Sequence, residues 1–198
     1  MAEARSRLSW RVVDMVTAAI LGVATGLIFL VWNQIGGVGY SLVDAVTPGL
    51  GGLVTGIWLL GGPLGGLVIR KPGAALFVET LAAIVSMALG SQWGIITLYS
   101  GLAQGLGAEL IFLLFLYRRF SVGVAALAGA GAGLGAWVFE GFYGNFAKSF
   151  TFLGIYASTL VISGALLGGI LAWGMVRGLA HTGALDRFAA GREIRERV

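Results

Sequence analysis

The sequence contains no cysteine and only one histidine, His181. Disulfides, thiolate metal sites and cysteine nucleophiles are therefore excluded, and one histidine cannot form a multi-histidine metal site. Neither Lys71 nor Lys148 follows a glycine, so the phosphate-binding loop G-x-x-x-x-G-K-[ST] is absent. The hydrolase and zinc-protease signatures G-x-S-x-G and H-E-x-x-H are absent too. We therefore expect no enzyme, cofactor or metal, and any pumping would need energy from another subunit or an ion gradient.

Charged residues are also scarce: they make up 11% of the 198 residues, against about 25% in soluble domains. Hydrophobic residues make up 58%, and the mean hydropathy is +0.91. The 34 glycines follow no three-residue period, which excludes collagen. They alternate with aliphatic residues, which argues against a flexible linker. These features predict an all-α integral membrane protein with closely packed helices.

Six apolar blocks are each long enough to cross a bilayer, which takes about 20 residues. They cover residues 12–34, 48–69, 73–89, 95–117, 121–142 and 152–176. Gly61-Gly62-Pro63 interrupts the second block, so we expect a kink or break there. The first block is too long for a cleavable signal peptide. We predict that residues 1–180 form a single six-transmembrane-helix bundle.

The positions of lysine and arginine predict the orientation. Of the 13 basic residues, 12 lie before the first block, after the sixth, or in the second and fourth connections. Residues 35–47, 90–94 and 143–151, which form the other connections, contain only Lys148. Because basic residues remain on the cytoplasmic side, both termini should be cytoplasmic, in a prokaryotic plasma membrane.

Small residues form stripes that let membrane helices approach closely. The first block carries Ala18, Gly22 and Gly26, and later blocks carry Gly129/Gly133, Gly131/Gly135 and Gly164/Gly168. In the fifth and sixth blocks, packing within the bundle is the favoured interpretation. In the first block, the stripe either packs internally or docks a second membrane subunit.

The tail, residues 181–198, is basic. Leu185, Phe188 and Ala189 would share one face of a helix, with arginines nearby. The tail is therefore either an amphipathic helix at the anionic inner membrane surface or a frayed cytoplasmic end.

Three carboxylates fall inside predicted spans. At 1.5 Å per residue, Glu79 lies about 9 Å, Glu109 about 14 Å and Glu140 about 28 Å from the inner edge. Glu79 and Glu109 must face the bundle interior or be protonated, since exposure to lipid would cost several kcal/mol. Asp14 is interpreted as a helix-end residue and Asp44 as a turn or cap.

The outer half is rich in aromatic and amide side chains, which suit a small heteroaromatic ligand through stacking, cation–π contact and hydrogen bonds. Part of this set fits an interfacial aromatic belt instead. The candidate substrate-binding residues are Gln92, Tyr99, Gln104, Trp137, Glu140, Tyr143, Asn145, Trp32 and Asn33, together with Glu79 and Glu109.

Motifs along nearly the whole chain are similar to those of one transporter family. They are Trp10-Arg11, Trp32-Asn33, Pro63-Leu-Gly-Gly, Arg70-Lys71-Pro72-Gly73-Ala74-Ala75 with Glu79, Gln92-Trp93-Gly94, Gly107-Ala-Glu109, Tyr117-Arg-Arg, and Thr182-Gly-Ala-Leu-Asp through Ala190-Gly-Arg192. The chain resembles the YkoE-type substrate-binding (S) components of energy-coupling factor transporters, a vitamin-uptake class of ABC importer.

The resemblance implies six helices, a substrate that is thiamine or its precursor hydroxymethylpyrimidine, a transmembrane coupling subunit and cytoplasmic ATPases. S components dock through an Ala-x-x-x-Ala motif on the first helix. The match here is Ala18-x-x-x-Gly22, extended to Gly26, so glycine replaces the second alanine.

Three functional hypotheses follow. The favoured one is an S component for hydroxymethylpyrimidine or thiamine, with a pocket open to the outside. The second is an S component for another small heterocyclic vitamin. The third is a self-sufficient proton-coupled carrier or channel that uses Glu79 and Glu109. A purely structural membrane subunit is a more distant alternative, and no hypothesis involves nucleic acid.

Overall fold

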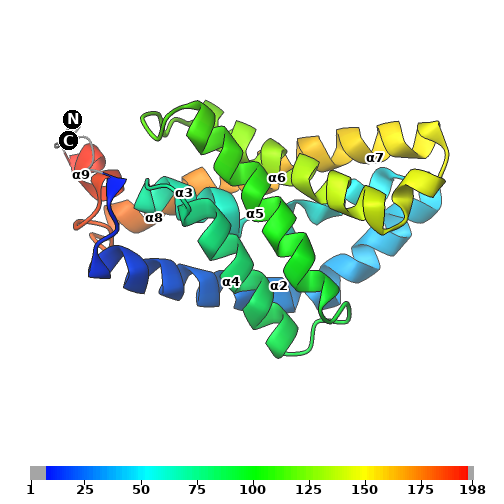
Figure 1. Cartoon of the computed structure of the whole chain (residues 1–198), viewed down its shortest axis with the longest axis horizontal. Coiled ribbons are helices and arrows are strands. Elements are labelled where there is room, and N and C mark those ends of the chain that lie inside the picture. The colour runs from blue at the N-terminus through cyan, green and yellow to red at the C-terminus, as the bar shows by residue number, and fades with distance from the viewer. Residues whose placement is uncertain (1–7, 196–198) are drawn as a thin grey trace.

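The computed structural model describes residues 8–195, which contain helices and turns and no strand (Figure 1). The elements are α2 (Val12–Val46), η1 (Leu50–Leu59), α3 (Gly61–Ile69), α4 (Ala74–Ala88), α5 (Ile96–Leu114), α6 (Val122–Tyr143), η2 (Asn145–Ala147), α7 (Phe150–Ser163), η3 (Gly164–Ile170), α8 (Leu171–His181) and α9 (Ala189–Arg195). Of these, η1 and η2 are 3₁₀ helices and η3 is a π-helix.

Within residues 8–195, five helical segments are long and apolar enough to cross a membrane. They are Val12–Val46, Leu50–Ile69, Ile96–Leu114, Val122–Tyr143 and Phe150–His181, while the apolar helix Ala74–Ala88 is shorter. The segments correspond in order to the six predicted blocks. The six-span count and the cytoplasmic termini remain predictions, because no membrane is present.

The first helix is longer than predicted. It continues to Val46 instead of ending at residue 34, so most of the expected loop 35–47 is helical. The physical reason is that no proline occurs before Pro48, and glycines alone weaken a helix without ending it. Asp44, on the last turn of α2, acts as a cap: its Oδ1 accepts hydrogen bonds from the backbone N–H groups of Gly49 (2.7 Å) and Gly51 (3.2 Å).

The second apolar segment breaks close to the predicted Gly61-Gly62-Pro63 position. Its first ten residues form the 3₁₀ helix η1, and α3 begins at Gly61. Runs of 3₁₀ helix longer than three or four residues are uncommon, so η1 needs support from its neighbours. That support comes from α7, where Thr159 donates a hydrogen bond to the Gly49 carbonyl (2.8 Å) and Ser163 donates to the Gly52 carbonyl (2.6 Å).

The small-residue stripes lie inside the bundle. Ala18, Gly22 and Gly26 are buried, and a Cβ at Gly22 or Gly26 would meet Leu81 or Val85 of α4 within 3 Å. The stripes of α6 face two neighbours: Gly129 meets Gly164 of η3, and Gly131 meets Gly107 of α5. These contacts agree with the internal-packing interpretation, and docking through the α2 stripe stays a prediction.

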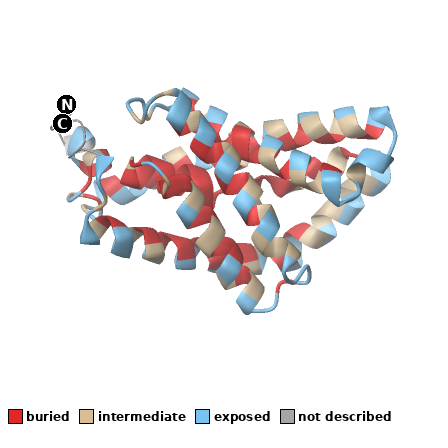
Figure 2. Ribbon diagram, in the orientation of Figure 1, coloured by how far each residue is buried: buried red, intermediate tan, exposed pale blue. Residues whose placement is uncertain are grey.

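The burial pattern places the core around α3 and leaves the long helices exposed on one side (Figure 2). All nine residues of α3 are buried. In contrast, only 33% of the residues in the most apolar stretch of α2 are buried. A membrane helix that is apolar all round can be exposed in this way, because lipid covers the outer face.

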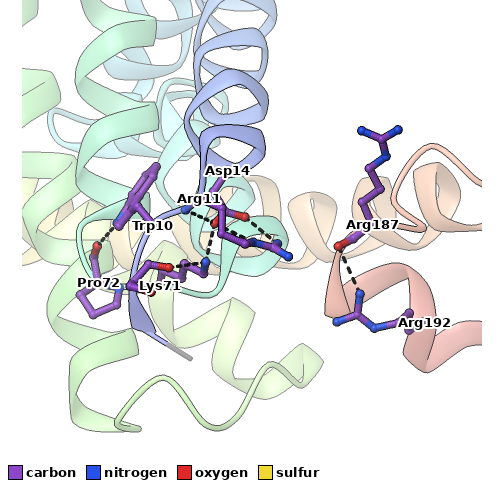
Figure 3. Close-up of polar contacts among 8 residues, drawn as sticks. Trp10, Arg11, Asp14, Lys71, Pro72, Arg187 and Arg192 are labelled. Atoms are coloured by element: carbon purple, nitrogen blue, oxygen red, sulfur yellow. Dashed lines mark hydrogen bonds and ion pairs between the residues drawn. The ribbon is translucent and has the colours of Figure 1, made fainter. Parts of the chain in front are cut away.

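One end of the molecule holds α9, the first residues of α2 and the α3–α4 connection (Figure 1). There, Asp14 contacts Lys71 and accepts a hydrogen bond from Arg11 Nη2 at 2.8 Å, and Trp10 Nε1 donates to the Pro72 carbonyl at 2.9 Å (Figure 3). These contacts tie the start of α2 to the α3–α4 connection. Asp14 is therefore a helix-end residue, as the sequence suggests.

The tail differs from both sequence interpretations over the residues that are described. Residues 182–187 form turns, and a helix begins only at Ala189. Leu185 and Phe188 are buried against the protein core, so they do not form a lipid-facing stripe. The physical reason is that both apolar side chains join the buried hydrophobic cluster, where removal from water stabilises them. Residues 196–198 lie outside the described part of the chain.

Candidate functional site

A cavity of about 540 Å³ lies at the end of the molecule opposite α9. Its walls come from α2, η1, α4, α5, α6 and α7, and its rim from the α4–α5 and α6–α7 connections. The volume falls within the range of about 300–1,000 Å³ that is usual for small-molecule sites. The charge pattern predicts that this end faces the outside of the cell.

Aromatic side chains form two walls of the cavity. Trp58 of η1 and Trp93 of the α4–α5 connection meet edge to face, with ring centroids 5.4 Å apart. Tyr40 of α2 and Tyr156 of α7 also meet edge to face, at 6.4 Å. A flat ring between these pairs would find aromatic faces and edges, which favour stacking and attract a cation.

Hydrogen bonds fix the polar groups of the walls. Asn33 joins three elements: its Oδ1 accepts from Trp58 Nε1 (2.8 Å), and its Nδ2 donates to Ser86 Oγ (3.0 Å). Glu140 Oε2 accepts from the Tyr156 hydroxyl at 2.5 Å. Both groups therefore have fixed orientations before any ligand arrives, which lowers the entropic cost of binding.

Gln104 forms the floor, and Glu79 lies directly beneath it. With its amide turned so that both ends are satisfied, the Gln104 nitrogen donates to Glu79 Oε1 (3.3 Å) and to the Trp58 carbonyl (3.1 Å), and its oxygen accepts from Ser100 Oγ (2.7 Å). Glu79 is fully buried, and its Oε2 accepts from the Gly62 backbone N–H at 2.6 Å. Glu79 thus joins the start of α3 to the floor without lining the cavity.

Glu109 has a different environment and does not line the cavity. Its carboxylate accepts hydrogen bonds from the backbone N–H groups of Gly73 (2.6 Å), Ala75 (2.9 Å) and Leu76 (3.2 Å), so it caps the start of α4. The Tyr117 hydroxyl, just beyond α5, also donates to it at 2.6 Å. Burial and the nearby carboxylate raise the pKa of Tyr117, so this phenol stays protonated and remains a donor.

The structure brings six of the eleven candidate residues together around the cavity. They are Asn33, Gln92, Gln104, Glu140, Tyr143 and Asn145. Glu79 lies beneath the floor and Glu109 lies at the start of α4. The remaining three do not line the cavity: Tyr99 is 51% exposed, Trp32 donates to the Val54 carbonyl, and Trp137 donates to the Leu153 carbonyl.

Several lining residues are absent from the sequence-based candidates. They are Phe29, Tyr40, Ser41, Thr55, Trp58, Ser86, Trp93, Thr97, Ser100, Phe139 and Tyr156. Tyr40 and Ser41 fell in the expected loop, so the longer α2 is what brings them to the site. Trp58, Trp93 and Tyr156 are aromatic residues of the outer half of the sequence-predicted bundle, but nothing in the sequence distinguishes them from Trp137.

The part of the chain that the structure describes has no cluster of three histidine, cysteine, aspartate or glutamate side chains that could hold a metal ion. The binding groups of the cavity are aromatic rings, amides, hydroxyls and one carboxylate. This combination suits an organic ligand with a flat ring and hydrogen-bonding substituents.

Comparison with known proteins gives three findings. Residues 13–135 match the family described as "ABC-type cobalt transport system, permease component". The chain is 33% identical over 190 residues to a Bacillus subtilis (strain 168) protein named "Putative HMP/thiamine permease protein YkoE", covering 96% of this chain and 94% of that protein. A crystal structure of an S-component of an ECF transporter superposes with a TM-score of 0.81 and 30% identity, covering 96% of this chain and 95% of the other.

Proposed function

We propose that this chain, which belongs to the YkoE-type substrate-binding (S) components of energy-coupling factor (ECF) transporters, captures thiamine or its precursor hydroxymethylpyrimidine in the 540 Å³ cavity. The chain is a multi-pass protein of the cell membrane and a transporter component, not an enzyme. The substrate is our inference, supported by the name of the Bacillus subtilis relative and by the chemistry of the cavity.

The observation that carries the proposal is the pairing of aromatic walls with fixed hydrogen-bonding groups. An aminopyrimidine ring presents an amine donor and ring-nitrogen acceptors in one plane. The Trp58–Trp93 pair offers a surface for stacking on that ring, while Gln92 and Asn145 at the rim offer amides. In thiamine, the thiazolium cation would find Glu140 and the rings of Tyr40 and Tyr156.

The test is a titration of the purified chain in detergent with thiamine and with hydroxymethylpyrimidine, followed by tryptophan fluorescence. We expect saturable quenching, because two tryptophans line the cavity. Trp93→Phe should remove much of the signal and weaken binding a few-fold, since phenylalanine keeps a smaller ring and loses only part of a stacking contribution of about 0.5–1.5 kcal/mol.

Trp137→Phe is the matched control, because Trp137 belongs to the same outer half but does not line the cavity. Affinity should stay within about twofold of wild type in this variant. If the folded protein binds neither compound, the substrate proposal is wrong. Mass spectrometry of ligand retained through purification would then distinguish another small heterocycle.

We further propose six spans, cytoplasmic termini, and assembly with a transmembrane coupling subunit and cytoplasmic ATPases. The absence of a phosphate-binding loop and the family both support a need for external ATPases. Ala18, Gly22 and Gly26 stay candidates for docking, but only if α2 and α4 separate, since α4 covers them here.

The alternative of a proton-coupled carrier that uses Glu79 and Glu109 has less support. The two carboxylates accept hydrogen bonds at the starts of different helices, Glu79 at α3 and Glu109 at α4. Uptake into liposomes by this chain alone, abolished by collapse of the proton gradient, would favour that alternative over ours.

A further inference from the structure

A second cavity, of about 250 Å³, lies at the opposite end of the molecule from the substrate cavity. The end of α3, the first half of α8, the start of α6 and the short helix α9 enclose it. It is smaller than most small-molecule sites, which measure about 300–1,000 Å³. A single small chemical group therefore fits it better than a whole vitamin or nucleotide.

Two arginines from different helices line this cavity, and each lies against an aromatic ring. The Arg70 guanidinium lies 4.5 Å from the centroid of Phe120. The Arg177 guanidinium lies 4.7 Å from the centroid of Trp173. Both rings also line the cavity, so stacking holds the two cations in fixed positions along its wall.

The two arginines differ in their anionic partners. Arg70 makes a two-pronged pair with Glu193 of α9, through Nη1–Oε1 at 2.5 Å and Nη2–Oε2 at 2.9 Å. No carboxylate within residues 8–195 pairs with Arg177, although its side chain is half-buried. The lining of the cavity therefore carries two positive charges and one negative charge, which leaves a net charge of one positive unit.

The remaining lining adds to the attraction for an anion. Ser121 caps the start of α6 and contributes a hydroxyl, and the helix macrodipole places partial positive charge at that end. The cavity lies at the end that carries the basic connections, which the charge rule assigns to the cytoplasm. Trp173 of α8 also lines the cavity, and tryptophan is common where lipid headgroups meet the hydrocarbon core.

We propose that this second cavity is a phosphate-binding site, in which the Arg177 guanidinium and the Ser121 hydroxyl hold a phosphate ester beside the Arg70–Glu193 pair. A guanidinium fork matches the oxygen geometry of phosphate, and a singly charged phosphodiester would neutralise the excess cation. The headgroup of an inner-leaflet phospholipid and a soluble phosphate ester share this chemistry. The position beside Trp173, a residue type common at membrane interfaces, favours the headgroup.

The experiment uses the full chain in an uncharged detergent and native mass spectrometry to count bound molecules. The probes are dioctanoyl-phosphatidylglycerol, dioctanoyl-phosphatidylcholine and sn-glycerol 3-phosphate. We expect one saturable phosphatidylglycerol, bound about tenfold more weakly by Arg177→Gln. Arg187→Gln is the matched control, because Arg187 is an exposed arginine that does not line the cavity.

Further variants make the test robust. Glu193→Gln should tighten binding, because it removes the negative charge that shares the cavity. If Arg177→Gln lowers the folded fraction, Arg177→Lys keeps the charge but loses the fork, and should still weaken binding relative to Arg187→Lys. None of these residues belongs to the substrate cavity, so the result is independent of the proposed transport function.

The outcomes separate clearly. Binding of glycerol phosphate as tight as that of phosphatidylglycerol, with the same dependence on Arg177, supports the site and assigns it to soluble esters. Equal weakening by Arg177→Gln and Arg187→Gln indicates general charge attraction and overturns the proposal. If none of the three probes binds in a one-to-one complex, the proposal is also overturned.

Discussion

At the scale of single residues, the intramembrane carboxylates have structural partners. Glu109 accepts hydrogen bonds from three backbone N–H groups at the start of α4 and from the Tyr117 hydroxyl. Glu79 accepts a hydrogen bond from the Gly62 N–H of α3. Each therefore satisfies donors at the start of a helix, where backbone N–H groups have no partner within the helix. Inside a membrane no water is present to accept hydrogen bonds from such groups, so these carboxylates serve as the acceptors instead.

Glu109→Ala should strongly destabilise the protein, because it leaves four donors without their acceptor. We expect a loss of at least about 3 kcal/mol in the free energy of unfolding, measured as a lower melting temperature in detergent. Glu109→Gln keeps one acceptor oxygen and should recover part of the loss. If Glu109→Ala instead abolishes ligand binding while the melting temperature stays unchanged, the capping role is wrong.

Thr25 gives the opposite case. Its side chain is fully buried, and its hydroxyl has no hydrogen-bond partner within residues 8–195. Thr25→Val keeps the shape and removes the unsatisfied hydroxyl, so it should stabilise the protein by about 1 kcal/mol. Thr25→Ser, which keeps the hydroxyl and loses the methyl group, should destabilise it. Thermal unfolding of the two variants side by side checks the sign.

At the scale of helices, glycine decides which pairs come close. Gly26 of α2 lies against α4, where an added Cβ would meet Val85 at 2.6 Å and the Ala82 carbonyl at 2.8 Å. Gly174 of α8 has open space where its Cβ would be. The same residue type thus serves close packing on one helix and lies at the surface on another.

Gly26→Ala should lower the stability of the isolated chain by about 1–3 kcal/mol, as expected for an overpacked contact. Gly174→Ala is the control and should stabilise α8 by up to about 1 kcal/mol, because alanine favours helices more than glycine does. Both effects are read as melting temperatures of the chain without partners. An unchanged melting temperature for Gly26→Ala would mean that the stripe serves docking alone.

At the scale of the whole molecule, sequence reasoning located the helices better than the site. Apolar length predicts six blocks, because bilayer thickness fixes how many residues a span needs; within residues 8–195 they correspond to five membrane-length helical segments and one shorter helix. The face that each helix turns inward was not predictable, since a lipid-facing side is as apolar as a buried one. Because of that ambiguity, the sequence predicts Trp137 as a binding residue and not Trp58, although Trp58 lines the cavity.

The local winding of the backbone was also beyond sequence reasoning. The 3₁₀ run Leu50–Leu59 and the π-helix Gly164–Ile170 pack against each other, with Gly168 beside Leu59. The two segments are distant in sequence, and each depends on contacts from the other. The helix propensity of one segment alone therefore predicts neither the 3₁₀ run nor the π-helix.

The orientation can be tested cleanly because the chain has no cysteine. Single cysteines at Ile95 and Ala147, exposed at the substrate-cavity end, should react with an impermeant maleimide added to whole cells. Cysteines at Arg119 and His181, exposed at the other end, should react only after the cells are opened. The reverse pattern would place both termini outside and contradict the charge rule.

The unequal lengths of the helices have a consequence for the surrounding bilayer. The 15 residues of α4 span about 22 Å, while the 35 residues of α2 span about 52 Å. A hydrocarbon layer about 30 Å thick exceeds the shorter helix, so lipids next to α4 must compress to meet it. Trp93 follows α4 and lines the cavity, so we expect this thinning beside it. The membrane surface should therefore be indented beside the cavity mouth, which would shorten the path of a water-soluble ligand to the site.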